Sequence, residues 1–364
     1  MEITWIWVWF VLVFAIGASV GSFLNVVVAR IPTERSIFWP SSSYCFRCFQ
    51  PIAWRYNLPI LGYLILRGKC ATCGKSYSSR YLWVELFTGM LFCLVFAMEI
   101  VWDVRAIGWV KQFPFEMKFG LVPLKGWAVF ATVITLISFL LAASLCDIEH
   151  LEIPLPITIT GTLVGLLLST IFAWPFPNEW LASAQALSKT EPMGRQTIAF
   201  GIQPWPFWHP LPFGLTPGGP LVGFLDGLAG AFVGALICRV VRWVYTLGRG
   251  IESMGVGDSD LMMMAGAFLG WQVVLVGFFA AVFPGIVVGV LQLFLKGSQV
   301  LPFGPSLALG CLIAFYSWPW LGLLLAPLFF DPILMGAMAI SSVIILGASS
   351  LIFRILGGVA PLSE

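Results

Sequence analysis

Long apolar stretches separated by short polar segments dominate this chain. A helix needs about 20 apolar residues to cross a bilayer, and nine stretches approach that length. They lie at 3–28, 82–102, 127–146, 155–174, 220–238, 261–278, 280–295, 306–327 and 333–352. The pattern predicts an all-α polytopic membrane protein, a bundle of about eight or nine transmembrane helices.

Composition supports the lipid bilayer as the main surrounding medium. The 364 residues are 59% hydrophobic and 10% charged, too apolar for one soluble core. A net charge of +2 is too small to indicate a nucleic-acid partner.

The basic residues predict the topology. The polar segment 29–81 carries eight Lys or Arg residues against one acid, Glu34, which by the positive-inside rule places it in the cytoplasm. Alternation then puts 146–152 and 255–260 on the cytoplasmic side and the Pro- and Trp-rich insertion 173–220 outside. We expect four regions: 1–102 with a polar lobe at about 30–81, 103–172, the insertion 173–220, and the C-terminal spans 221–364.

Four of the eight cysteines form two C-x-x-C pairs, Cys45/Cys48 and Cys70/Cys73. Four thiolates on one short segment are typical of a closed tetrahedral zinc site, and a reducing cytoplasm favours metal over the alternative of disulfides. We expect a structural zinc that folds a lobe too small for a core of its own. The other thiols, Cys93, Cys146, Cys238 and Cys311, are interpreted as packing residues.

Acidic residues are scarce, and two clusters stand where spans meet the cytoplasmic face. The first, "CDIEHLEIP", holds Asp147, Glu149 and Glu152; the second, "GVGDSD", holds Asp258 and Asp260. Glu149, Glu152 and Asp260 are interpreted as interfacial acids that reach water. Asp258 is flanked by Gly255 and Gly257, which permit unusual backbone conformations and close helix approach, so we expect a functional role for it.

Two aspartates brought together from different helices have a well-defined chemistry. Like charges at short range cannot both ionise, so one carboxyl keeps a proton. The ionised partner takes a proton from water while the protonated one polarises a carbonyl, and a peptide bond is hydrolysed. A Cys/His hydrolase built on Cys146 and His150 lacks the orienting groups it would need.

The motifs resemble, in order, the bacterial type IV prepilin peptidases, membrane aspartic proteases with a G-x-G-D signature. The similar segments are "GASVGSFLNVVVARIP" (17–32), the four-cysteine segment 45–86, "DIEHLEIP" (147–154), "GVGDSDLMMMAGAFLGW" (255–271) and "LPFGPSLALG" (301–310). The resemblance implies Asp147 and Asp258 as the catalytic pair and Cys45, Cys48, Cys70 and Cys73 as the metal site.

The resemblance also implies the biology. The family removes the basic leader of type IV prepilins and type II secretion pseudopilins at the cytoplasmic face of the bacterial inner membrane. Members with the four-cysteine domain typically methylate the new N-terminus with S-adenosylmethionine; no residues are assigned to the methyl donor. The chain departs from the family pattern at Asp260, where Lys is usual, at Leu155, where an acid or amide is usual, and in the length of the insertion 173–220.

Alternative hypotheses are a peptidase-only member, a presenilin-like intramembrane protease, an inactive scaffold, and a transporter with proton-relaying carboxylates. The four-cysteine segment disfavours the presenilin type. A transporter would show inverted halves with interrupted helices, and no such symmetry is visible.

Overall fold

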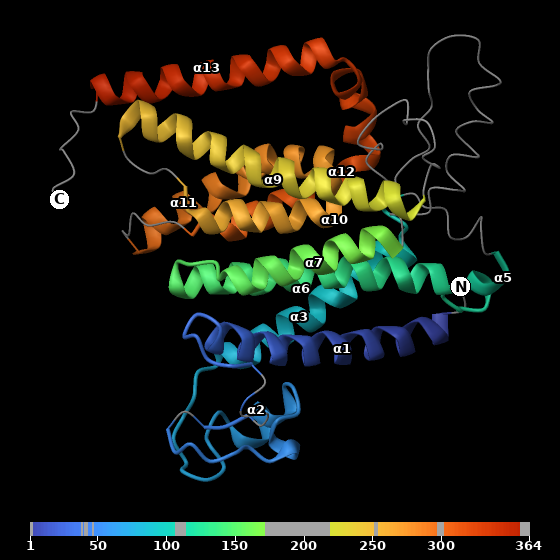
Figure 1. Ribbon diagram of the computed structural model, residues 1–364. Coiled ribbons are helices and arrows are strands. Elements are labelled where there is room, and N and C mark those ends of the chain that lie inside the picture. Colours follow the sequence, from blue (N-terminus) through green and yellow to red (C-terminus); the bar gives the residue numbers. More distant parts are fainter. Residues whose placement is uncertain are drawn as a thin grey trace. The chain divides into compact units, whose positions relative to one another are not determined.

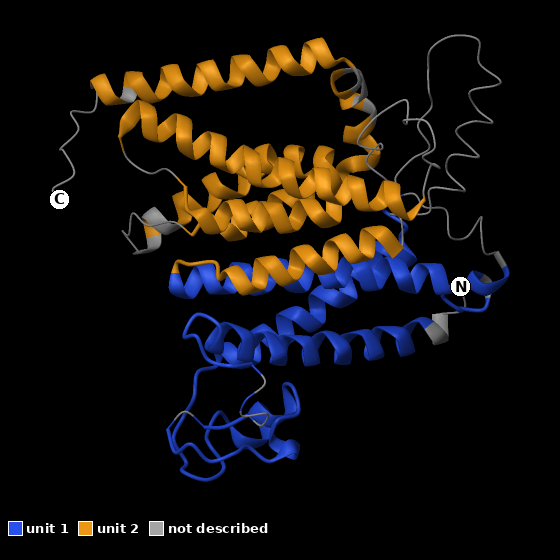
Figure 2. Ribbon diagram, in the orientation of Figure 1, with its two compact units in different colours: residues 1–150 blue, residues 151–364 orange. Residues whose placement is uncertain are grey.

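The computed structural model describes residues 3–37, 39, 43–45, 47–105, 114–171, 219–250, 254–296 and 302–356. These residues are helical apart from turns and two isolated β-bridges, as the sequence predicts. The insertion expected at 173–220 lies outside the described residues except for its last two. Two compact units divide the chain, 1–150 and 151–364, coloured separately in Figure 2.

The first unit contains three long helices and the cysteine lobe. The helices are α1 (Ile3–Arg30), α3 (Arg80–Phe96, extended by the π-helical turn η2, Ala97–Val101) and α6 (Leu124–His150). Short elements are η1 (Trp54–Tyr56), α2 (Leu61–Leu66) and α5 (Pro114–Lys118). Figure 1 shows the lobe, with α2, beside the end of α1 from which the chain enters it.

Small residues and aromatic rings hold α1, α3 and α6 together. Gly17 lies so close to α3 that an added Cβ would stand 2.9 Å from Gly89 Cα. Towards the other end, Phe96 contacts the rings of Phe10 from α1 and Trp127 from α6, with centroids 5.5 and 5.8 Å apart. Such aromatic contacts add to the stability gained from buried area.

The second unit contains α7 (Leu155–Ile171), α9 (Pro220–Arg249), α10 (Val256–Ala280), α11 (Val282–Lys296), α12 (Gly304–Phe330) and α13 (Pro332–Leu356). The central helix is α10, which packs against α9, α12 and α7, while α13 packs against α9. α10 bends at Gly270, whose φ of 77° and ψ of 169° interrupt the helical geometry.

The helices suit a bilayer in length and composition. Among the described residues, six helical stretches are long and apolar enough to cross a membrane, and α7 is a shorter apolar helix. The six are Ile6–Arg30, Arg80–Val101, Leu124–His150, Pro220–Arg249, Val256–Leu291 and Pro332–Ile352. Many large apolar side chains on them are exposed, such as Ile333 and Ile355 of α13. This surface fits a multi-pass membrane protein.

Several helices, among them α6, α9 and α10, extend further than the hydrophobic pattern predicts. α6 continues to His150 and therefore includes Asp147, α9 continues to Arg249, and α10 begins at Val256 and includes Asp258. The pattern underestimated them because hydropathy marks where polar residues begin, whereas backbone hydrogen bonding continues past that point.

Candidate active site and metal centre

The four cysteines sit in two turns with the same backbone geometry. In the first turn Cys45 N–H donates to Gln50 O at 3.0 Å and Phe49 N–H donates to Cys45 O at 2.8 Å. In the second, Cys70 N–H donates to Lys75 O and Gly74 N–H donates to Cys70 O, both at 2.9 Å. The residue after each second cysteine has a positive φ, 57° at Phe49 and 67° at Gly74.

Backbone amides also point at the first sulfur of each turn. Arg47 N–H donates to Cys45 Sγ and Thr72 N–H to Cys70 Sγ, both at 3.4 Å. An amide aimed at sulfur stabilises a thiolate, which is the form that binds metal. Hydrogen bonds from the backbone of Cys73 and Thr72 lower the pKa of Cys70 to about 6.

The neighbouring thiols have the opposite effect on Cys48. A backbone hydrogen bond from Gln50 would lower the pKa of Cys48, but desolvation and the other three thiols outweigh it and raise the pKa to about 11. A bound cation would favour the thiolate at every position.

The four sulfur atoms converge on one point. All lie within 4.8 Å of one another, with Cys45 to Cys73 and Cys48 to Cys70 each 4.0 Å apart. A tetrahedral site with Zn–S bonds of about 2.3 Å would place its sulfurs about 3.8 Å apart. These distances are far from the roughly 2 Å of a disulfide. The cluster can therefore bind a metal ion with four sulfur ligands.

Asp258 stands in the first turn of α10 and is buried, with 9% of its surface exposed. Its Oδ2 accepts the backbone N–H of Gly255, the N-cap residue, at 3.2 Å. This hydrogen bond ties the carboxylate to the start of the helix, where the helix dipole favours a negative group.

The glycines that flank Asp258 differ in their surroundings. An added Cβ at Gly257 would stand 2.9 Å from Ile153 Cβ, so only glycine lets α10 approach the segment that precedes α7. At Gly255 the nearest atom would be Asp258 Oδ2 at 3.6 Å, which is ordinary contact. Close approach therefore requires the second glycine and not the first.

Asp260 does not reach water as expected. It is only 8% exposed, and its Oδ1 lies 3.8 Å from Nη2 of Arg239 on α9. The same arginine donates from Nε to Ser259 Oγ at 3.2 Å, and Ser259 donates to Ala235 O at 3.1 Å. These contacts fix the start of α10 against α9. The expectation was wrong because hydropathy places acids at span ends without showing which neighbouring helix supplies a cation.

Asp147 stands in the last turn of α6 and is also buried, at 7% exposed. Glu149, two residues further on, forms an ion pair with Arg80 at the start of α3, and Glu152 is exposed. Asp147 belongs to the first compact unit and Asp258 to the second. Each is a buried carboxylate at the end of a long apolar helix. Cys146, Cys238 and Cys311 are buried, as packing residues should be.

Sequence reasoning missed three buried acids. Asp226 on α9 is 6% exposed, and its Oδ1 has no hydrogen-bond partner among the described residues. Glu99, inside the predicted span 82–102, is fully buried in η2 and bonded to Arg105. Glu85 on α3 accepts Ile60 N–H from the lobe at 2.7 Å. The sequence did contain a signal for these residues, because each is an acid that stands alone within an apolar stretch.

Two family models match parts of the chain that contain the cysteine cluster and Asp258. A family model described as the bacterial peptidase A24 N-terminal domain matches residues 15–99, which hold all four cysteines. A model described as the type IV leader peptidase family matches residues 195–290, which hold Asp258. The chain belongs to the type IV leader peptidase family. Asp147 lies between the two matched regions.

Curated relatives carry the name "Prepilin leader peptidase/N-methyltransferase". The protein from Myxococcus xanthus (strain DK1622) is 33% identical over 79% of this chain, which spans 64% of that protein's length. Those from Pectobacterium carotovorum and Pseudomonas putida are 28% and 29% identical and are covered over 91% and 87% of their lengths. No solved structure matches the chain.

Proposed function

We propose that Asp147 and Asp258 together hydrolyse the leader peptide bond of type IV prepilins and pseudopilins. The observation that carries the proposal is the burial of two carboxylates at the ends of long apolar helices, one in each half of a leader peptidase family chain. Asp258 lies beside Gly257, which contacts Ile153, and Ile153 follows Asp147 by only six residues in the chain.

The reaction needs a single proton shared by the two carboxyl groups. The ionised carboxylate accepts a proton from water as the water oxygen attacks the peptide carbonyl, and the protonated carboxyl donates a hydrogen bond to the carbonyl oxygen. The tetrahedral species then breaks as a proton passes to the leaving nitrogen. The pair titrates as a unit.

The active site opens to the cytoplasm in this proposal. Eight basic residues between 29 and 81 support that orientation through the positive-inside rule. A prepilin would keep its apolar helix in the bilayer of the inner membrane and present its charged leader at the cytoplasmic boundary.

The metal at the cysteine cluster is zinc with a structural role. Four protein sulfurs complete a tetrahedral shell and leave no open position for a substrate. Its part is to hold the two turns of the lobe together, since the lobe buries little apolar area: Trp54, Phe49 and Leu64 are all exposed.

The chain also methylates the newly formed N-terminus, with S-adenosylmethionine as methyl donor. The support is the four-cysteine domain and the names of the relatives, which join the two activities. Methyl transfer needs a donor site distinct from the two aspartates.

The decisive experiment is mass spectrometry of a co-expressed type IV prepilin. Asp147→Asn and Asp258→Asn should each abolish the leader-length mass loss while the protein stays inserted in the membrane. The matched control is Asp331→Asn: Asp331 caps α13 by accepting Ile333 N–H at 2.9 Å, and Asn caps equally well. Normal cleavage by either of the first two variants would refute the aspartic pair.

The same experiment separates the two activities. A further methyl-sized gain that depends on added S-adenosylmethionine supports methylation. Cleavage without that gain leaves a peptidase-only enzyme, the alternative that the sequence allows.

A further inference from the structure

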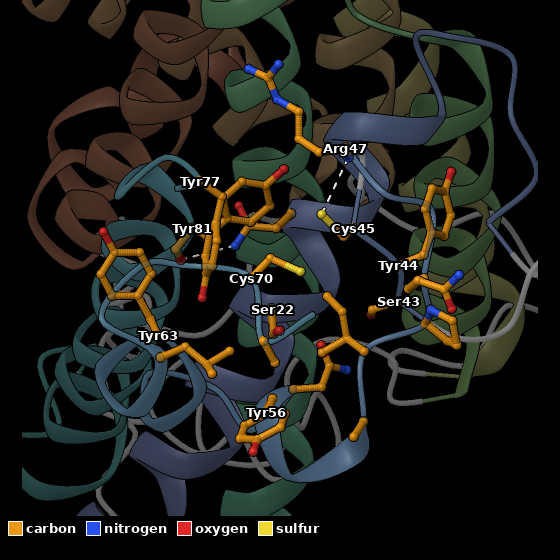
Figure 3. Close-up of a pocket in the computed structure, with 18 of the residues that line it drawn as sticks. Ser22, Ser43, Tyr44, Cys45, Arg47, Tyr56, Tyr63, Cys70, Tyr77 and Tyr81 are labelled. Atoms are coloured by element: carbon orange, nitrogen blue, oxygen red, sulfur yellow. Dashed lines mark hydrogen bonds between the residues drawn. The ribbon is translucent and has the colours of Figure 1, made fainter. Parts of the chain in front are cut away.

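A cavity of about 520 Å³ lies between the cysteine lobe and the helices α1 and α3. Every residue that lines it belongs to the first compact unit. Its volume is within the range of sites that take a small organic molecule. Figure 3 shows side chains from the lobe and from both helices turned into it.

Tyrosine rings form much of the cavity wall. Tyr63 contacts Tyr77 edge to face with centroids 5.3 Å apart, and Tyr77 contacts Tyr81 at 6.1 Å. Figure 3 shows these three on one side of the cavity and Tyr44 on the other. Aromatic faces attract flat heteroaromatic rings and cations alike.

Two buried polar side chains, Glu85 and Asn25, line the cavity on the side of the helices. Glu85 is 9% exposed and accepts hydrogen bonds from Ile60 N–H and from the Ser22 hydroxyl. A carboxylate can accept about four hydrogen bonds, so its capacity is not exhausted. Asn25 is 3% exposed, and its Oδ1 has no hydrogen-bond partner among the described residues, although its Nδ2 donates to Tyr81 O. Leaving a buried acceptor unpaired is costly, which indicates that a ligand completes the site.

Positive charge lies in the same cavity. Arg30 is 5% exposed, donates to the backbone oxygens of Ser36 and Ile37, and stands 5.4 Å from the ring centroid of Tyr44. The cavity is thus lined by the anionic side chain of Glu85, by the cationic side chain of Arg30 and by tyrosine rings. This combination suits a zwitterion attached to a flat ring system and disfavours a lipid tail, which could not donate a hydrogen bond to Asn25 Oδ1.

We propose that this cavity binds S-adenosylmethionine, with Glu85 facing the cationic part of the donor and the tyrosines contacting its rings. The proposal rests on the methylation put forward under Proposed function and adds the site. In this proposal the donor contacts side chains of α1 and α3 as well as side chains of the lobe.

Binding to the detergent-purified full chain tests the proposal without any turnover. The probes for isothermal titration calorimetry are S-adenosylhomocysteine, which is uncharged at sulfur, and sinefungin, which carries an ammonium group at the corresponding place. Glu85→Gln should weaken sinefungin binding on the order of tenfold and change S-adenosylhomocysteine binding much less, because only sinefungin carries a positive charge at the position of the donor's sulfonium. Asn25→Leu should weaken both.

Glu34→Gln is the matched control, since Glu34 is an exposed acid of the same unit that does not line the cavity. It should bind both probes as the unmodified chain does. Metal content and thermal unfolding report whether each variant is folded. Should a cavity variant fail to fold, photolabelling of the unmodified chain with an azido-adenosyl analogue still locates the site, and the labelled peptides should fall within residues 22–85.

The outcomes distinguish the site from the activity. If the unmodified chain binds neither probe while it still removes the leader, the methyl-donor part of the proposed function is wrong. If it binds both but Glu85→Gln behaves as Glu34→Gln does, or the label falls in residues 151–364, the donor is used and this cavity is not its site.

Discussion

Arg239 on α9 and Asp260 on α10 form an ion pair beside Asp258, with Nη2 3.8 Å from Oδ1. The family pattern usually has Lys at the position of Asp260. Because Arg239 occupies the neighbouring position on α9, an acid here gives attraction, whereas Lys would give repulsion. The departure at Asp260 is therefore matched by a cation on the adjacent helix.

Asp260→Lys should destabilise the protein rather than restore a family feature. The Arg239 side chain is 63% exposed, so the loss should be small, about 1 kcal/mol or less. Thermal unfolding in detergent measures it. The double variant Arg239→Glu/Asp260→Lys reverses both charges and should regain the lost stability. A single variant as stable as the unmodified chain would contradict this account.

The contact between α9 and α10 depends on glycine. An added Cβ at Gly230 would stand 2.1 Å from Gly266 O, a backbone atom that cannot move aside cheaply. Gly230→Ala should therefore lower stability by about 1–3 kcal/mol, although alanine is the better helix former. Leader cleavage should fall as well, because this contact positions α10, the helix that carries Asp258, against α9.

The control for Gly230 is Gly336→Ala on α13, where an added Cβ would meet no atom within 4 Å. There alanine should be neutral or raise stability by up to about 1 kcal/mol. Equal effects of the two substitutions on thermal unfolding would show that close approach does not limit the α9/α10 contact.

Hydrophobic runs were sufficient to predict the helices, and cysteine spacing was sufficient to predict the metal cluster. Both rest on short-range rules: a span needs a certain apolar length, and C-x-x-C brings two thiolates to one turn. The convergence of Cys45 with Cys73, 28 residues apart, also followed, since four thiolates on one short segment favour a single ion.

The sequence pattern could not predict which side chains on different helices would contact one another. Nothing local indicates that Arg239 would face Asp260, or that Asn25, Arg30 and Glu85 would share one cavity. These contacts depend on how helices pack and which face each one buries. Glu99 lies inside the predicted span 82–102, but its partner Arg105 lies past the end of that span, so hydropathy could not show that the two residues would pair.

Glu99 and Arg105 form a fully buried pair, in which Nη2 donates to Oε2 at 2.7 Å and the two residues are 0% and 2% exposed. Arg105→Met should cost about 3–5 kcal/mol because it leaves a buried carboxylate without its counter-ion. The double variant Glu99→Leu/Arg105→Met removes both charges and should recover most of the loss. Thermal unfolding measures both, and additive losses in the double variant would argue against coupling of the pair.

Metal binding by the four-cysteine cluster should disappear when one ligand is lost. If zinc binds as proposed, Cys48→Ser should reduce the zinc content from one ion per chain to none and expose the lobe to limited proteolysis, since each of the two turns supplies two of the four sulfurs. Cys93→Ser is the control: this half-buried thiol of α3 lies outside the cluster, and the zinc content should not change. Elemental analysis of purified protein gives both values.

The zinc content should also depend on pH in one direction. Binding requires thiolates, so protons compete with the metal as pH falls. Without metal the pKa of Cys70 is lowered to about 6 and that of Cys48 is raised to about 11, so at neutral pH Cys70 is a thiolate and Cys48 loses its proton only when the metal binds. Zinc should therefore be released progressively as pH falls below neutral, together with protease protection of the lobe. Retention of zinc in Cys48→Ser, or release at high rather than low pH, would rule out the four-thiolate site.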